Sequence, residues 1–493
     1  MSMKNFTLSC LGLLTVMLTV LGAGSCANII PPGGGPRDTI PPVLVGAVPK
    51  DSLTFFKANK IVLTFDEYIQ LDNPLDNIIV SPNPVNAPEV TGKLKTVTIK
   101  LRDSLLPNTT YSINFGNALK DVNEGNIRKN FTYLFSTGPD IDNRTISGKV
   151  LLARTGGIDS TLIVVLQSNL NDSAIVKDRP LYYTRLDGNG NFRFHNLPAG
   201  TFAIYALPND YTKRYDDSTK LFAFLNEPVP SLDSASAKPV TLYAYQEEPV
   251  LEKKSATTTT STDKSSGDKN KKEADKRLKY ATSLESGRQD LLGNLQLNFI
   301  RPLKTFDSSG IRLTDTNYHP LTGVRFSLDT TGKSITLYYK WPPTTYYRLV
   351  IDKAAVTDTL GINLPKSDTL GFVTKSETDY GSIRLRFPDL DLSRNPVLQL
   401  VQNNVVVDSS ALTGREWYRS IYRPGEYAIR ILFDSNRNGT WDPGKFLGVH
   451  KQPEIVQAVP TPMNIKADWE NEAEIKLNEP PPGNKRLKQQ APN

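Results

Sequence analysis

A run of oxygen-bearing side chains near the C-terminus is the part of this sequence best suited to bind a metal ion. The side chains belong to Asp434, Asn436, Asn438 and Asp442, and a glycine follows the third of them. Alternate oxygen donors followed by a glycine can wrap a hard cation such as Ca²⁺, because every second side chain points inward. The sequence therefore predicts structural calcium here. The alternative is a polar turn, held by Asx side chains, after a strand over 428–433.

Residue types that carry catalysis are sparse. The three histidines, His195, His319 and His450, lie too far apart for a zinc-binding helix motif. The sequence contains no Gly-x-Ser-x-Gly motif, P-loop or Gly-x-Gly-x-x-Gly fingerprint. Asp66 and Glu67 are adjacent carboxylates, but neighbouring strand residues face opposite sides of a sheet. We expect a protein that is not an enzyme, although folding could still pair two distant carboxylates as in a glycosidase.

Adjacent aromatic residues are the other binding candidates, because an outward ring can stack on a sugar or anchor a protein partner. The pairs are Tyr182-Tyr183, Tyr338-Tyr339, Tyr346-Tyr347 and Trp417-Tyr418. In a strand, one member of each pair faces the core and the other faces solvent. Tyr347 and Trp417 are the predicted binding residues. The alternative is one core ring beside one surface contact with a neighbouring strand.

The N-terminal segment predicts export and lipid anchoring. Lys4 supplies a short positive region, an apolar run extends over 11–21, and small residues lead to Cys26. This is the layout of a signal peptide over residues 1–25 and is too short for a comfortable membrane span. The small residues before the cysteine resemble a bacterial lipobox, which implies a lipid on Cys26. The alternative is ordinary cleavage near Ser25 and a free thiol, since Cys10 leaves with the signal peptide and no disulfide partner remains.

Charge and low-complexity segments argue against a nucleic-acid-binding protein. The net charge of +7 is spread over 58 basic and 51 acidic residues. Much of the excess lies in a Ser/Thr/Lys-rich stretch over 248–285, which we expect to be a disordered linker. The alternative is a basic strip that contacts anionic lipid or glycan. The Pro/Gly-rich residues 26–42 are expected to form a tether, and residues 479–493 a disordered tail.

The rest of the chain has the pattern of short β-strands. The first of them cover Lys60–Phe65, Asn77–Val80, Thr96–Leu101, Tyr111–Phe115 and Tyr133–Ser136. Proline, asparagine and glycine separate these runs. Short strands at regular spacing indicate an all-β sandwich.

Three motifs of this region resemble the bacterial Ig-like domain first described in S-layer proteins. They are the strand Ile61-Val62-Leu63-Thr64-Phe65-Asp66-Glu67, the turn Leu106-Pro107-Asn108-Thr109-Thr110-Tyr111, and the closing Phe135-Ser136-Thr137-Gly138. The resemblance implies an Ig-like fold over 43–138, which we call domain A.

A second sandwich is expected over 145–247, which we call domain B. Asp187-Gly188-Asn189-Gly190 lies between alternating runs and predicts a hairpin turn, because these residues tolerate positive φ. With Leu197-Pro198-Ala199-Gly200-Thr201-Phe202-Ala203-Ile204-Tyr205, the region is similar to the carboxypeptidase-regulatory-like, or prealbumin-like, β-sandwich. That resemblance implies no peptidase site.

The C-terminal half repeats these motifs in the same order. Trp341-Pro342-Pro343-Thr344-Thr345-Tyr346 matches the turn of domain A, and Arg423-Pro424-Gly425-Glu426-Tyr427-Ala428-Ile429 matches the run from Leu197 in domain B. Two motifs that recur at nearly one period indicate duplication of a two-domain unit. We therefore predict an all-β array of Ig-like and prealbumin-like sandwiches in the order A-B-linker-A′-B′, with A′ over 286–378 and B′ over 379–478.

Two functions of different classes follow. The first is a membrane-anchored extracytoplasmic lipoprotein, similar to those of Bacteroidota, with a structural or protein-interaction role in the cell envelope. The second is a carbohydrate-binding or adhesin-like surface lipoprotein with structural calcium. The expected partners are the membrane, through the N-terminal lipid, other envelope proteins and, in the second function, glycans. Ala27 follows Cys26 in place of an inner-membrane retention aspartate, so the outer membrane is expected, facing either the periplasm or the cell surface.

Overall fold

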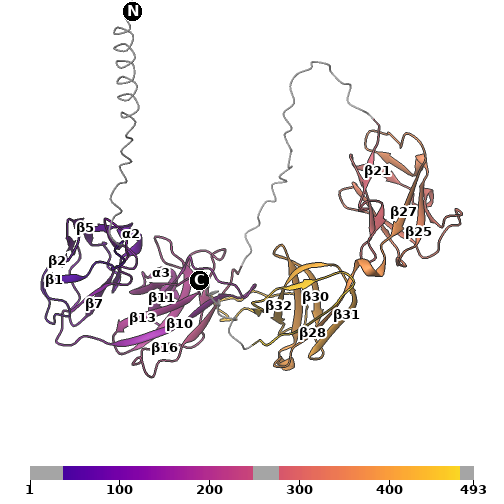
Figure 1. Ribbon diagram of the computed structural model, residues 1–493. Helices are drawn as coiled ribbons and strands as arrows, with labels where there is room; N and C mark the ends of the chain where they lie inside the picture. Colours follow the sequence, from indigo (N-terminus) through magenta and orange to yellow (C-terminus); the bar gives the residue numbers. More distant parts are fainter. Residues whose placement is uncertain (1–36, 248–276, 478–493) are drawn as a thin grey trace, which may run out of the picture. The chain divides into compact units, whose positions relative to one another are not determined.

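The structure is a computed structural model that describes residues 37–247 and 277–477 (Figure 1). The predicted signal peptide, the lipidation residue Cys26, the tail and most of the predicted linker lie outside the described residues. Described regular structure is almost entirely β-strand, and its helices are single turns. The chain divides into two compact units, Met1–Asp142 and Asn143–Asn493. Each unit is treated separately below.

Domain A contains two main sheets and a short ribbon. The first sheet has the order β1 (Leu44–Val48), β2 (Lys60–Phe65), β6 (Thr96–Lys100) and β5 (Glu89–Lys93). The second has β4 (Ile79–Ser81), β7 (Thr110–Asn114) and β9 (Thr132–Ser136), while β3 (Ile69–Leu71) pairs with β8 (Leu119–Asp121) and α2 covers Pro74–Asn77. Ile61, Leu63 and Phe65 alternate into the core because strand side chains point to opposite faces in turn.

Domain B is a two-sheet sandwich. One sheet has the order β13 (Asn191–Leu197), β10 (Arg144–Leu152) and β17 (Val240–Ala244), with β10 and β17 parallel. The other has β12 (Tyr182–Arg185), β11 (Leu162–Gln167), β14 (Thr201–Pro208) and β15 (Ala223–Phe224), and β16 (Val229–Pro230) also pairs with β14. The short helix α3 covers Ser173–Lys177.

Domain A′ has the strand order of domain A, with one additional strand at the edge of its second sheet. One sheet contains β18 (Tyr280–Thr282), β20 (Leu295–Phe299), β24 (Ser334–Tyr338) and β23 (Arg325–Leu328). The other contains β19 (Arg288–Gln289), β27 (Asp368–Thr374), β25 (Tyr346–Ile351) and β22 (Ile311–Thr314), and β21 (Leu303–Phe306) pairs with β26 (Val356–Asp358). Single 3-10 turns lie at η1 (Ser308–Gly310), η2 (Lys353–Ala355) and η3 (Glu377–Asp379).

Domain B′ likewise repeats domain B, including its parallel strand pair. One sheet contains β31 (Glu416–Tyr422), β28 (Gly381–Arg386) and β35 (Glu470–Glu474), with β28 and β35 parallel. The other contains β30 (Val405–Ala411), β29 (Pro396–Gln402), β32 (Gly425–Phe433) and β33 (Ile455–Ala458), with β34 (Met463–Ile465) also paired to β32 and a 3-10 turn, η4, at Leu392–Arg394. The predicted all-β array of duplicated sandwiches is therefore confirmed.

The repeated Thr-Thr-Tyr turns make the same contact in both copies. The Thr109 N–H donates to the Thr137 hydroxyl at 2.9 Å, and the Thr345 N–H donates to the Thr374 hydroxyl at 2.8 Å. In each case the hydroxyl then donates to a carbonyl of the preceding Pro-containing segment. The motif that signalled the duplication therefore fixes the same corner between two strands in each domain.

Two expectations need correction. The turn at Asp187 is present, and its carboxylate accepts the N–H of Asn189 and of Asn191, each at 2.8 Å. It joins β12 to β13, which lie in different sheets, so it is an arch and not a hairpin. The folded part of A′ also begins before residue 286, since β18 lies within the predicted linker and Leu278 is buried in the A′ core.

Candidate functional site

The loop after β32 brings the predicted calcium donors together, but it also occupies their oxygens. Asp434 is buried, and its carboxylate accepts the N–H of Arg437 and of Gly439, each at 2.7 Å. The carboxylate of Asp442 accepts side-chain amide hydrogens from Asn436 and from Asn438. This is the hydrogen bonding of an Asx-held turn.

Glu454 is a buried carboxylate of this loop that sequence reasoning missed. Its oxygens accept the Ser435 N–H at 2.7 Å and the Asp442 N–H at 3.1 Å. It lies twelve residues beyond Asp442, outside the spacing that a linear calcium motif scans. Asp434, Asp442 and Glu454 bring three carboxylates to one loop, and a carboxylate oxygen that accepts an N–H keeps a second lone pair that could bind a cation. Calcium here stays a prediction.

Tyr347 and Trp417 are not surface binding residues. Tyr347 is 5% exposed and Trp417 is 6% exposed, and both belong to domain cores. Burial accordingly raises the pKa of Tyr347 to about 12. In these two pairs one ring faces inward and the other outward, but the outward members are Tyr346 and Tyr418. Strand phase decides which ring faces inward, and the pair alone does not reveal the phase.

A different aromatic side chain lies in a surface groove of B′. Trp469 is 61% exposed, and the Lys466 ammonium lies 4.7 Å from its ring centroid. Both residues line a groove of about 830 Å³ together with Met463 and Glu470. An exposed ring beside polar side chains is suited to stacking on a sugar. Trp469 has no aromatic neighbour in the sequence, so the search for pairs passed over it.

Domain A contains a group of three carboxylates. One oxygen each of Glu67, Asp121 and Glu124 lies within 4.8 Å of the others. Among the described residues, these three carboxylates are the group close enough together to share a metal ion. Burial raises the pKa of Glu67, and the charge of Asp121 adds to this effect. Asp66 is not part of the group, since its carboxylate accepts the Val43 N–H.

Asp121 is the buried member of this carboxylate group. Its oxygens accept the backbone N–H groups of Glu124, Gly125 and Asn126 at 2.6, 2.8 and 2.8 Å. Burial opposes its charged form, but these N–H donors outweigh burial and lower the pKa of Asp121.

The same position in A′ carries the opposite charge. Ile69 pairs with Asp121 in A, and Leu303 pairs with Asp358 in A′. Glu67 and Arg301 each lie two residues before the first member of these pairs. The Arg301 Nε donates to the carboxylate of Asp358 at 2.7 Å. A guanidinium thus neutralises the buried aspartate in one copy, and in the other copy two further carboxylates surround it.

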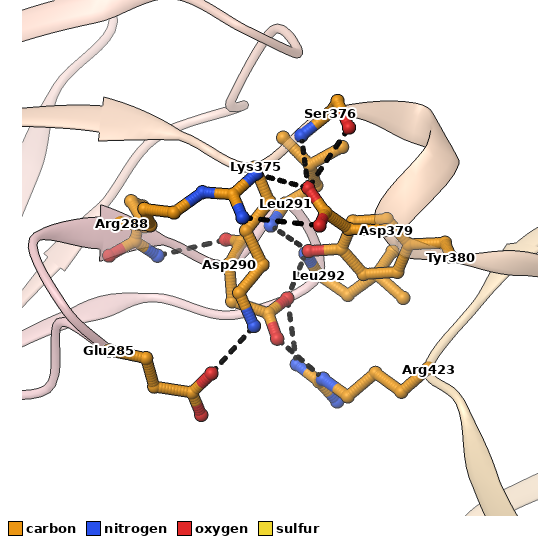
Figure 2. A network of polar contacts seen from close by, with 11 residues as sticks. Glu285, Arg288, Asp290, Leu291, Leu292, Lys375, Ser376, Asp379, Tyr380 and Arg423 are labelled. Carbon is orange, nitrogen blue, oxygen red and sulfur yellow. Dashed lines mark hydrogen bonds and ion pairs between the residues drawn. The ribbon is translucent and has the colours of Figure 1, made fainter. Parts of the chain in front are cut away.

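The junction between A′ and B′ is a second polar cluster, shown in Figure 2. Arg423, from the turn before β32, meets Asp290, which follows β19, with Nε to Oδ2 at 2.8 Å and a second contact at 3.3 Å. The Leu291 N–H donates to the Tyr380 hydroxyl at 2.7 Å, and burial raises the pKa of Tyr380 to about 12. These contacts tie the segment after β19 to the residue before β28 and to the turn before β32.

A second ion pair supports the short connection between the two domains. Arg288 contacts Asp379 with Nη1 to Oδ1 at 3.2 Å, and the Asp379 carboxylate also accepts the Ser376 N–H at 2.7 Å. Burial disfavours the charged form of Asp379, but the N–H of Ser376 and the Arg288 guanidinium lower its pKa below the usual range. The η3 turn is therefore held on both sides, and the cluster joins the two domains.

Across the described residues, no helix combines the length and apolar character that crossing a membrane requires.

Comparison with known proteins supports the fold of the first domain. Residues 38–137 match the bacterial Ig-like domain family. A comparison with curated proteins found no match.

Solved structures with similarity include two proteins of Bacillus. The major pilin subunit BcpA of Bacillus cereus matches at 13% identity and a TM-score of 0.17, covering 69% of this chain and 100% of the pilin. The Bacillus anthracis TIE protein matches at 10% identity and a TM-score of 0.16, covering 90% of this chain and 75% of that protein. The N-terminal part of the bacterial S-layer protein SbsC matches at 14% identity and a TM-score of 0.15, covering 35% and 42%. At these values the matches carry no functional argument.

Proposed function

We propose that this chain is a lipid-anchored extracytoplasmic protein with a structural or protein-interaction role in the cell envelope. The observation that carries the proposal is the duplicated pair of sandwiches, whose A′–B′ junction is fixed by the Arg423–Asp290 and Arg288–Asp379 ion pairs. Such an array of domains can act as a spacer and can present domain surfaces to protein partners. Its polar clusters hold turns and the A′–B′ junction together.

Lipidation of Cys26 would supply the anchor. Small residues precede this cysteine, and an acyl chain contributes roughly 0.8 kcal/mol per buried CH₂. We expect Cys26→Ser to move the protein from the membrane to the soluble fraction and to remove the acyl mass from the mature chain. Cys10→Ser is the matched control and should leave both unchanged. Membrane retention of the Cys26→Ser protein would contradict the anchor.

The sequence around Cys26 also leads us to propose which membrane holds the protein and which partners it has. We place the protein in the outer membrane, facing the periplasm or the cell surface, and protease treatment of intact cells distinguishes these two orientations. Affinity purification from native membranes should recover other envelope proteins. We also propose that the protein is not an enzyme. Conversion of peptidoglycan, polysaccharide or casein to products by the purified protein would contradict this.

Carbohydrate binding is the second candidate, and the Trp469 groove is the observation that favours it. Tyr347 and Trp417 are buried, so the groove replaces them as the site of sugar stacking. If B′ binds glycans, Trp469→Ala should abolish binding on a glycan array. Tyr346→Ser, which changes an exposed ring of A′, is the control. Equal binding by Trp469→Ala and wild-type protein would contradict this candidate.

A further inference from the structure

A segment of B′ fills an apolar surface of B. Phe446 lies between β32 and β33 of B′, in a loop closed by an antiparallel bridge between Lys445 and Lys451. Its side chain is 1% exposed. Every other buried member of the apolar cluster around it belongs to domain B. Its ring centroid lies 5.0 Å from that of Phe224, 5.1 Å from that of Phe222 and 5.6 Å from that of Tyr205. We call residues 444–452 the plug.

The surface that receives the plug is the outer face of a sheet of B. In β11, Val164 faces the core of B, whereas Ile163 and Val165 join the outer cluster. Tyr205 and Leu207 of β14 lie in the same cluster. A strand that is apolar on both faces needs cover on both faces. We call this outer apolar face of B the socket.

Polar contacts surround the aromatic centre. Glu247 accepts the Phe446 N–H at 2.8 Å, and His450 Nε2 lies 2.6 Å from the Asp172 carboxylate. The Gln452 side chain donates to the Phe224 carbonyl at 3.1 Å. A desolvated ring within a polar rim is the anatomy of a specific protein interface.

The two backbones also approach closely beside the plug. The Val456 N–H of β33 donates to the Ala153 carbonyl of B at 2.8 Å. Gly156 of B has a φ of +67°, and a Cβ there would lie 2.6 Å from the Ala458 nitrogen. The close approach admits glycine only, so the shapes of the two surfaces are matched at the backbone as well.

We propose that B and B′ dock as one body through this plug and socket, so that the linker and A′ form a loop closed by a non-covalent contact. The occupant of the socket is residues 444–452 of the same chain. In B′ the corresponding outer cluster is small, and Trp441 of B′ itself packs against it. Each chain therefore carries one socket and one plug. Because the plug fills the socket of its own chain, the contact does not link chains into a filament.

Cleavage of the linker tests the proposal on the full chain. A protease site placed within residues 248–276 gives two fragments that carry B and B′ separately. We expect the wild-type fragments to co-elute in size-exclusion chromatography at micromolar concentration. Phe446→Ala should weaken their association about a hundredfold, because a buried aromatic residue at the centre of an interface is removed. Trp469→Ala, outside the contact, should leave it unchanged.

A charge swap distinguishes lost docking from misfolding. Asp172→Lys should weaken the association of the fragments, because it removes the carboxylate that His450 Nε2 contacts, and the double variant Asp172→Lys with His450→Glu should restore it through an opposite-charge pair. Wild-type fragments that separate while both remain folded would overturn the proposal, as would co-elution of the Phe446→Ala fragments. An uncut chain that sediments as a monomer supports the closed loop. A dimer lost in Phe446→Ala would place the plug in a second copy and overturn closure within one chain.

Discussion

At the residue scale, the carboxylate group of domain A and the ion pair of A′ show what a single charge does to the same backbone. Asp121 and Asp358 are both buried and both accept N–H groups from the turn that follows. Arg301 adds a positive partner in A′, whereas Glu67 adds a negative neighbour in A. A buried charge is stable only with donors or an opposite charge around it. In domain A the donors to Asp121 are the backbone N–H groups of Glu124, Gly125 and Asn126, together with the side chain of Asn126.

We predict that Glu67→Gln stabilises unit 1 at neutral pH by roughly 0.5 kcal/mol, since it removes a partly exposed repulsion. The folded-state pKa of Glu67 is raised, so its ionised form costs stability above that pKa, and the cost disappears as the pH falls through it. The gain from Glu67→Gln should therefore be full at pH 7 and vanish in acid. Thermal melts across this range measure it, and a gain that persists in acid would contradict the assignment.

Asp121 has the opposite pH dependence. Its pKa is lowered in the folded protein, so its contribution to stability is present above the unfolded value and is lost as the pH falls through the folded value. Asp121→Asn should thus destabilise unit 1 at pH 7, with a smaller effect below the pKa of Asp121.

The buried aromatic residues give a third prediction. Trp417→Ala should destabilise B′ by about 3–5 kcal/mol, the cost of removing a large core side chain. Trp417→Phe should cost much less, because the indole Nε1 has no hydrogen-bond partner among the described residues. Tyr418→Ala, which changes the exposed neighbour, is the control in chemical denaturation. Equal effects at positions 417 and 418 would show that the inward and outward assignments are wrong.

At the element scale, side-chain hydrogen bonds and ion pairs hold turns and the junction between domains. The loop after β32 is held by Asp434, whose carboxylate accepts N–H groups from within the loop. We predict that Asp434→Ala destabilises B′ by about 1–3 kcal/mol through unsatisfied N–H groups, with or without calcium. A chelator distinguishes a calcium-binding loop from a turn held by hydrogen bonds alone. If calcium occupies the loop, the chelator should lower the melting temperature of wild-type B′ and leave that of Asp442→Ala unchanged. If it does not, the chelator should change neither melting temperature.

The A′–B′ junction yields a prediction about domain coupling. The Arg423 guanidinium counters the burial of Asp290 and lowers the pKa of that carboxyl. Arg423→Met should weaken the coupling of the domains by about 1 kcal/mol, because a partly buried carboxylate loses its partner. A double-mutant cycle with Asp290→Asn measures the coupling. Arg384→Met is the matched control, since Arg384 pairs with Glu416 and Glu472 within B′.

At the scale of the whole molecule, separate cores predict separate unfolding. Domain A has its own core and forms unit 1, whereas the cluster around Phe446 joins B to B′ within unit 2. Calorimetry should therefore resolve at least two transitions. Phe446→Ala should move a transition of unit 2 and leave that of unit 1 in place, and a single transition shifted as a whole would contradict this division.

The sequence alone determined the all-β class, the order of the sandwiches and their duplication. Period-2 runs such as Lys60–Phe65 and the repeated Thr-Thr-Tyr turns are local signals, because side-chain alternation and turn chemistry act over a few residues. The same local signals located the loop at Asp434. They also predicted one inward and one outward ring in each aromatic pair.

Tertiary structure decided everything that depends on distant residues. Strand phase against the opposite sheet buried Trp417 and exposed Tyr418, and the sheet partner made the turn at Asp187 an arch. The approach of Asp121 to Glu67 and of Phe446 to the socket of B joins segments that no local pattern connects. Sequence records which side chains are available, but contacts between remote strands arise only when the whole chain packs its apolar faces together.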